Sequence, residues 1–157
     1  MTVPDEVDVL LVEGDPLEAE LLLRALRGLS EPARIGHARD GEEALDYLLG
    51  RGAFRHRLGG SLPRLVLLEL KLPRVDGVEV LRTLRASPRT VTVPVVVLTS
   101  SAEPREVTQC YQAGANSCVR KPVDFREFAE TIQMLGRYWL RLNRVGPGAV
   151  GAAQASS

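Results

Sequence analysis

Polar side chains capable of phosphoryl chemistry follow several apolar runs in this 157-residue chain. The set contains three carboxylates, one hydroxyl and one ammonium: Glu13, Asp15, Glu69, Thr99 and Lys121. Carboxylates gathered in this way can hold a divalent cation through hard oxygen ligands, and an ammonium and a hydroxyl can neutralise a phosphoryl group. These residue types therefore predict phosphoryl chemistry wherever the fold brings the ends of the runs together.

Lys121 is the most distinctive member of the set. The chain has 20 basic residues, but only Lys71 and Lys121 are lysines. Lys121 comes directly before Pro122, in a predicted turn where a lysine has no packing reason to be. We therefore expect its ammonium to contact the acidic residues.

The elements that must position these residues are strands and helices in alternation. Apolar runs predict strands at residues 7–12, 34–38, 65–70, 93–98 and 117–120. Segments of helical periodicity predict helices at residues 16–29, 42–49, 78–86, 105–113 and 125–142. Asp15 precedes the first helix, and we expect Asp15 and Glu18 to form a capping pair there.

This alternation predicts an α/β fold, because consecutive parallel strands need crossover helices on both faces of their sheet. We predict a doubly wound, five-stranded parallel sheet, the (βα)5 architecture of flavodoxin-like proteins. Ligands of such sheets bind beyond the carboxyl ends of the strands. The fold would thus gather the polar set at one edge.

Composition excludes several classes of function. The formal net charge is zero, so neither nucleic acid nor a membrane is expected as a partner. Neither a spanning segment nor a signal peptide is indicated, and we expect a cytoplasmic protein. Cys110 and Cys118 have no zinc-ligand spacing and do not form a disulfide framework.

One domain is predicted, at residues 7–143, because the length suits a single core. Residues 1–6 are interpreted as an N-terminal extension, and the Gly- and Ala-rich residues 144–157 as a flexible tail. The basic segment at residues 51–63 lacks a clear period and is interpreted as a long surface loop.

Four segments of the chain resemble those of a known family. In order and spacing, they resemble the receiver domains of two-component response regulators: LLVEGDP, LVLLELKLPRVDG, VPVVVLTSS and GANSCVRKP. That family has an acidic pair after the first strand, a phospho-accepting aspartate after the third, Thr or Ser after the fourth and Lys-Pro after the fifth. The closing segment is similar to the small single-domain receivers that partner bacterial phytochromes and similar sensor histidine kinases.

The resemblance implies a role for each residue of the site. It assigns Glu13 to the acidic, metal-binding pair, Thr99 to the switch hydroxyl and Lys121 to the phosphate-contacting ammonium. Two positions depart from the family pattern: Gly14 stands where the family has a metal-ligating carboxylate, and Glu69 where it has the phospho-accepting aspartate.

Both departures weaken phosphorylation. The extra methylene of Glu69 moves the carboxylate by about 1 to 1.5 Å, which spoils in-line attack on a phosphodonor. Gly14 removes one hard ligand, so Mg²⁺ binding through Glu13 would be weak or absent, and no other cofactor is expected. Asp15 has two interpretations, as a replacement ligand or as the cap of the first helix.

Two further residues also have alternative interpretations. Glu69 either imitates part of a phosphoryl charge by contacting Lys121 or Thr99, which would fix an active-like state, or simply pairs with Lys121 in a retired pocket. Thr99 either acts as a switch or caps the turn that follows its strand.

The last predicted helix carries an apolar stripe with a seven-residue repeat. We predict a homodimer interface along it, formed by Phe128, Ile132, Leu135, Tyr138, Trp139 and Leu142. In the alternative interpretation, the end of this helix folds back on its own core.

Three functions follow from these predictions. The first is a non-enzymatic, stand-alone atypical receiver that acts through protein–protein contacts with a histidine kinase or another signalling protein. The second is a conventional phosphate-accepting receiver or phosphate sink. The third is a flavodoxin-like cofactor enzyme, which the sequence disfavours because Glu13 and Asp15 would repel a phosphate after the first strand.

Overall fold

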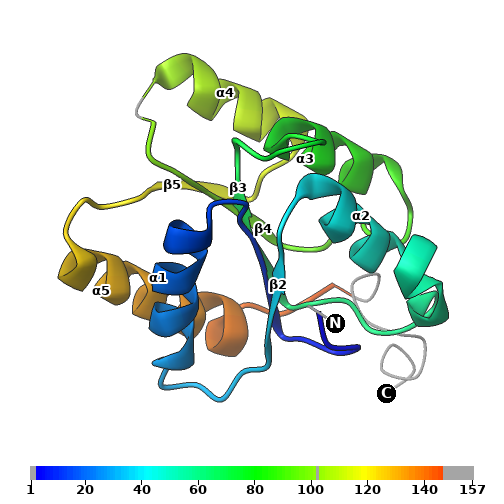
Figure 1. Ribbon diagram of the computed structural model, residues 1–157, viewed down its shortest axis with the longest axis horizontal. Coiled ribbons are helices and arrows are strands. Elements are labelled where there is room, and N and C mark those ends of the chain that lie inside the picture. Colours follow the sequence, from blue (N-terminus) through cyan, green and yellow to red (C-terminus); the bar gives the residue numbers. More distant parts are fainter. Residues whose placement is uncertain (1–2, 102, 147–157) are drawn as a thin grey trace.

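The computed structural model describes residues 3–101 and 103–146, which form a sheet between two layers of helices (Figure 1). The strands are β1 (Val9–Val12), β2 (Ile35–Ala38), β3 (Leu65–Glu69), β4 (Val95–Thr99) and β5 (Ser117–Arg120). They lie in the order β2-β1-β3-β4-β5, and every neighbouring pair is parallel. The predicted doubly wound sheet of five parallel strands is confirmed.

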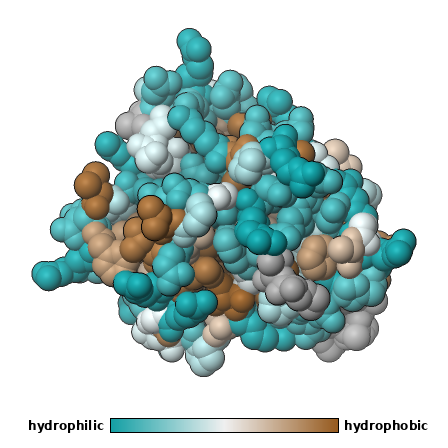
Figure 2. All heavy atoms as spheres, viewed as in Figure 1, coloured by the Kyte–Doolittle hydropathy of each residue, from teal (hydrophilic) through white to brown (hydrophobic). Residues whose placement is uncertain are grey.

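Helices cover both faces of the sheet. Helices α1 (Pro16–Arg27) and α5 (Phe125–Gly136) pack on one face, with α2 (Gly41–Leu49), α3 (Gly77–Ala86) and α4 (Pro104–Ala113) on the other (Figure 1). Strand residues alternate between these two cores, as the pleat requires. Figure 2 shows a largely hydrophilic surface on which hydrophobic atoms gather over α1 and α5.

Aspartates begin four of the five helices. Asp15, Asp40, Asp76 and Asp124 each accept a hydrogen bond from a backbone N–H in the first turn of the helix that follows. Side-chain capping of this kind stabilises a helix by about 0.5–2 kcal/mol. These four caps fix where the chain turns at the carboxyl edge of the sheet.

The segment at residues 51–63 is more ordered than a surface loop. It contains a 3-10 helix at Gly52–Arg57, and Phe54, Arg57 and Leu62 are buried. Sequence periodicity missed this because one short turn buries too few residues to show a repeat.

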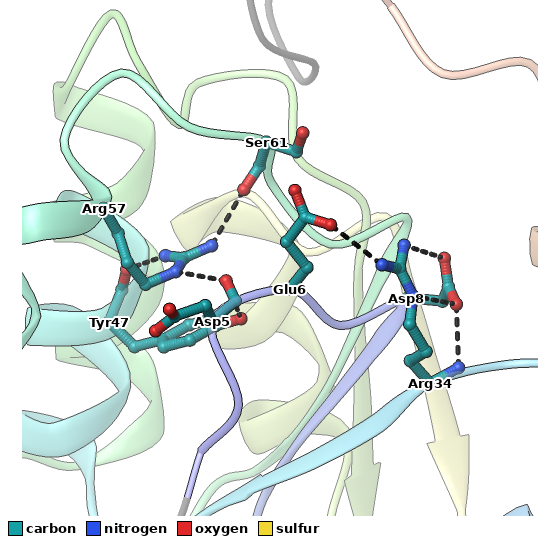
Figure 3. A network of polar contacts seen from close by, with 7 residues as sticks. All are labelled: Asp5, Glu6, Asp8, Arg34, Tyr47, Arg57 and Ser61. Carbon is teal, nitrogen blue, oxygen red and sulfur yellow. Dashed lines mark hydrogen bonds and ion pairs between the residues drawn. The ribbon is translucent and has the colours of Figure 1, made fainter.

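The N-terminal extension is also part of the domain, because Val3 is buried in the core. Arg57 donates hydrogen bonds to the carbonyls of Asp5, Tyr47 and Ser61, and its guanidinium lies 3.6 Å from the centre of the Tyr47 ring (Figure 3). Arg57 therefore joins residues 3–8, called the N-terminal strap below, to α2 and to the segment that follows α2. Residues 3–6 therefore pack with the domain that the sequence predicts at residues 7–143.

A second arginine holds the strap at its other end. Arg34 pairs with Glu6 at 2.9 Å and with Asp8 at 3.2 Å, just before β2 (Figure 3). The pKa of the Asp8 carboxyl lies below its usual value. Burial raises this pKa, but the hydrogen bonds and the charge of Arg34 lower it by a larger amount. Residues 3–8 are therefore tied to the body of the domain at several points.

The last helix changes geometry at Gly136. A Cβ there would lie 2.5 Å from Leu29 Cδ2, so glycine permits close packing against the end of α1. The chain continues as a π-helix at Arg137–Leu142, and Asn143 N donates to Tyr138 O over 2.6 Å. The single helix predicted at residues 125–142 is therefore an α-helix up to Gly136 and a π-helix after it.

The wider π turn shifts the buried face by one residue, so the predicted stripe does not continue in phase. Leu140 is buried, whereas Leu142 is 62% exposed. Arg64 donates to the Leu140 carbonyl, which ties this end back onto the domain. The fold-back interpretation is thus confirmed for the segment around Leu140.

The residues of the predicted dimer interface differ in their exposure. Phe128 and Ile132 are buried against the sheet, while Leu135 and Trp139 pack partly on the same core. Tyr138 and Leu142 are the predicted interface residues that remain largely exposed.

Most of the predicted tail, residues 147–157, lies outside the described residues. Among the residues that are described, no helix is long and apolar enough to cross a membrane.

Candidate functional site

The carboxyl ends of β1, β3 and β5 bring Glu13, Glu69 and Lys121 together. Lys121 Nζ lies 2.9 Å from Glu13 Oε1 and 2.6 Å from Glu69 Oε2. The side chain of Lys121 is 10% exposed, that of Glu13 is 3% exposed and that of Glu69 is 11% exposed. The cluster is therefore largely shielded from water. The expected contact of the lysine with the acidic residues is present.

Glu18 of α1 is a further member of the cluster. Its Oε2 lies 3.5 Å from Lys121 Nζ, because side chains in the first turn of a helix lean back toward its N-terminus. Asp15 caps α1 as predicted, but Glu18 does not take part in the predicted capping pair. Asp15 accepts from Leu17 N and Glu18 N, while the Asp15 N–H donates to Glu13 Oε2 and not to Glu18.

More negative than positive charge surrounds Lys121, and two pKa values reflect this. Burial raises the pKa of the Glu69 carboxyl, and nearby Glu13 raises it further; the bonds and charge of Lys121 offset only part of the rise. Burial lowers the pKa of the Lys121 ammonium, but its bonds to Glu69 and Glu13 outweigh that effect and the net shift is upward. Both groups hold their protons more tightly than usual, as an anionic pocket requires.

Thr99 is buried at the end of β4. Its hydroxyl oxygen accepts a hydrogen bond from Ser101 N at 3.0 Å, and its carbonyl accepts one from Lys121 N at 2.8 Å. The hydroxyl thus caps the turn after its strand, as one of the two interpretations predicts. Its switch role stays a prediction.

Gly14 lies in a closely packed position. A Cβ on Gly14 would stand 2.8 Å from Pro73 Cδ and 3.2 Å from the Arg39 carbonyl oxygen. Pro73 belongs to the β3–α3 loop and was not a site candidate in the sequence, since nothing in its local pattern indicates this contact.

Mg²⁺ is the metal that the family resemblance implies, and the donor set does not fit it. Gly14 offers no side-chain oxygen, and Asp15 is engaged as a helix cap. The nearest oxygens of Glu13 and Glu69 already contact the Lys121 ammonium. Within residues 3–101 and 103–146, no group of three or more His, Cys, Asp or Glu side chains could hold a metal ion.

An apolar surface adjoins the cluster. Leu21 is 38% exposed and Val123 is fully exposed, and both line a hollow of about 290 Å³. The hollow is lined by residues of α1, the turn after β4, the β5–α5 connection and α5: Glu18, Leu21, Ser100, Lys121, Pro122, Val123, Phe125 and Phe128. The ion cluster therefore stands at one end of an apolar recess between α1 and α5.

This combination of fold and strand-end cluster is that of a signalling receiver domain. Residues 9–133 match the family model of the response regulator receiver domain. The chain belongs to the response regulator receiver family, a signalling domain of two-component systems. The family match favours this class over the flavodoxin-like cofactor enzyme.

Two relatives match this chain over 90% or more of their own length. The chain is 43% identical over 145 residues to the probable methanogenesis regulatory protein FilR2 of Methanothrix harundinacea (strain 6Ac), covering 92% of this chain and 90% of that protein. It is 46% identical to the bacteriophytochrome response regulator AtBRR, with a TM-score of 0.69, covering 90% of this chain and all of that one.

The phosphorylated cyanobacterial phytochrome response regulator RcpA gives a TM-score of 0.80 at 29% identity, covering 87% of this chain and 96% of that one. The resemblance to phytochrome-associated receivers is thereby confirmed.

Proposed function

We propose that this chain is a non-enzymatic, stand-alone receiver whose switch face is held by the Glu69–Lys121 ion pair without phosphorylation. The observation that carries the proposal is the 2.6 Å contact between these two charges at the carboxyl edge of the sheet. This contact lets the Glu69 carboxylate imitate part of the charge that a phosphoryl group would bring to the ammonium. The longer side chain of Glu69 adds the geometric obstacle described above.

A sensor histidine kinase is the partner that we propose, docked on the apolar recess between α1 and α5. The exposed Leu21 and Val123 offer apolar contacts beside Lys121, and an amphipathic helix is the natural complement of such a recess. AtBRR, to which the chain is similar, is a bacteriophytochrome response regulator, and a phytochrome-like kinase is the corresponding candidate.

The second candidate function is a conventional phosphate-accepting receiver or sink. It is favoured by the similarity to RcpA, whose structure is that of a phosphorylated protein.

Incubation with a small phosphodonor and Mg²⁺, followed by intact mass measurement, separates the two functions. We expect no stable gain of a phosphoryl group, because Glu69 is paired and the donor set does not suit Mg²⁺. A phosphorylated relative such as RcpA serves as the positive control. A stable phosphoryl adduct on Glu69 would overturn the proposal in favour of the second function.

A further inference from the structure

We propose that Cys110 and Cys118 form a reversible redox pair, in which a hydroperoxide oxidises Cys118 and Cys110 then closes a disulfide that ties α4 to β5. This inference goes beyond the proposed function and is independent of it, because it involves neither Glu69 nor Lys121.

The two cysteines come from neighbouring elements that pack on one core. Cys110 is a buried residue of α4, and Cys118 lies on β5 opposite Val97 of β4. Both side chains pack in the core between the sheet and the layer formed by α2, α3 and α4. Packing thus brings together two thiols whose spacing in the sequence does not indicate a pair.

The turn between α4 and β5 places the thiols side by side. Gly114 adopts the left-handed conformation with φ of 109°, and Ala115 N donates to the Cys110 carbonyl at 3.0 Å. Cys118 N donates to the Tyr111 hydroxyl at 3.1 Å, which fixes the strand against the helix. The Cys110 thiol donates a hydrogen bond to the Cys118 sulfur, so the two sulfur atoms face each other.

Their surroundings give the two thiols different roles. Burial raises the pKa of Cys110 to about 12, and the interactions with Cys118 contribute to that rise. Burial also raises the pKa of Cys118, but the hydrogen bond from Cys110 lowers it and so favours the Cys118 thiolate over the Cys110 thiolate. Cys118 is partly exposed, whereas Cys110 is buried. Cys118 is therefore the thiol that an oxidant meets first, because thiolate character and exposure decide susceptibility.

Oxidation by hydrogen peroxide needs no group other than the two thiols. The Cys118 thiolate attacks one peroxide oxygen, the O–O bond breaks, and the released hydroxide takes the proton that the thiol has lost and leaves as water. The Cys110 sulfur then attacks the sulfur of the Cys118 sulfenic acid, the S–O bond breaks, and hydroxide leaves as water with the Cys110 proton. The two sulfur atoms together give up two electrons, and one peroxide molecule becomes two water molecules.

Helix α4 can adjust to the new bond. Its buried residues are Cys110 and Ala113, and within the described residues the side chain of its N-cap, Glu103, accepts no hydrogen bond from the first turn. A helix held by few buried side chains can shift by the small amount that an S–S bond requires. The disulfide then holds α4 against β5, the strand at the edge of the sheet.

The first test detects the disulfide. Wild type is treated with hydrogen peroxide without denaturant, its remaining thiols are alkylated in urea, and the chain is digested with trypsin. Both cysteines lie in one tryptic peptide, residues 106–120. We expect this peptide to be about 2 Da lighter than its unmodified form and to take up two alkyl groups once dithiothreitol has reduced it. Two alkylated cysteines before reduction, an intermolecular disulfide or irreversible oxidation of either thiol would overturn the proposal.

The second test examines the order of the steps with Cys110→Ala and Cys118→Ala. Both variants are treated with hydrogen peroxide in the presence of dimedone, which traps sulfenic acids. We expect Cys110→Ala to carry the adduct on Cys118, with at least about tenfold less adduct on Cys110 in Cys118→Ala. Equal labelling of the two variants, or no labelling of Cys118, contradicts the assigned order.

The third test measures how the bond affects the helix. Amide hydrogen exchange is compared between the oxidised and the reduced wild type. We expect the amides of α4 to exchange at least about threefold more slowly after oxidation, because the bond restrains local opening of the helix. Helix α2 is the matched control, since it belongs to the same layer and contains no cysteine. Unchanged exchange in α4, or equal slowing in α2, would refute the tie between α4 and β5.

Discussion

At the scale of single residues, the surroundings of Glu69 determine the ionisation of its carboxyl group. Its carboxylate ends a buried strand, contacts Lys121 at 2.6 Å and shares that ammonium with Glu13. Two acids and one base in a shielded pocket leave net negative charge. Although Glu69 pairs with Lys121, ionising its carboxyl group therefore still costs free energy in the folded chain.

This imbalance predicts how stability depends on pH. The pKa of Glu69 is higher in the folded chain than its ordinary 4.5, so the folded state binds this proton more tightly than the unfolded state. The contribution of Glu69 to stability is thus fully present below the ordinary value and is lost as pH rises through the folded value. We expect the free energy of unfolding of wild type, relative to Glu69→Gln, to fall as the pH rises above the ordinary value of 4.5.

Urea unfolding of both proteins across this range provides the measurement. Glu20→Gln is the control because Glu20 is exposed on α1. A difference between wild type and Glu69→Gln that stays constant or grows with pH would contradict the assignment.

At the scale of elements, helix caps decide where the site residues stand. Asp15 both begins α1 and donates its N–H to Glu13, so one residue fixes the helix and the first acidic side chain. Glu18 reaches Lys121 from the same first turn. The start of α1 is thus a structural part of the site.

Asp15→Ala should therefore lower the free energy of unfolding by about 1 kcal/mol, through the lost cap. Asp15→Asn should retain most of the stability, because an asparagine side chain also caps. Thermal and urea unfolding measure both variants. If the two substitutions are equally damaging, the carboxylate has a role beyond capping, such as the metal ligation considered from the sequence.

At the scale of the whole molecule, apolar side chains are exposed on α5 and on the π-helix that follows it. Tyr138 and Leu142 are exposed on the π-helix, and Met134 is 64% exposed on the preceding helix. We propose that a homodimer forms through these side chains, since the other predicted interface residues pack wholly or partly on the core.

Leu142→Glu should raise the dimer dissociation constant at least about tenfold, because it puts a charge into an apolar contact. Leu58→Glu is the control, as Leu58 is 68% exposed on a different segment. Sedimentation velocity over a range of concentrations measures both. A monomeric wild type, or equal effects of the two substitutions, would refute this interface.

The sequence by itself determined the order of the elements and the strand-end chemistry. Buried parallel strands must be nearly continuous apolar runs, so β1, β3 and β4 are visible without coordinates. Because parallel strands end at one edge, the meeting of Glu13, Glu69 and Lys121 also followed from their positions in the chain.

Tertiary structure alone decided the features that depend on contacts between distant segments. Pro73 beside Gly14, Arg57 beneath the N-terminal strap and the phase shift after Gly136 each arise from packing between residues far apart in the chain. Local pattern carries no record of such contacts, because it reports which face of an element is apolar and not what lies against it. The sequence thus indicated which charges meet in the pocket, and the tertiary structure showed which loops and helix starts enclose them.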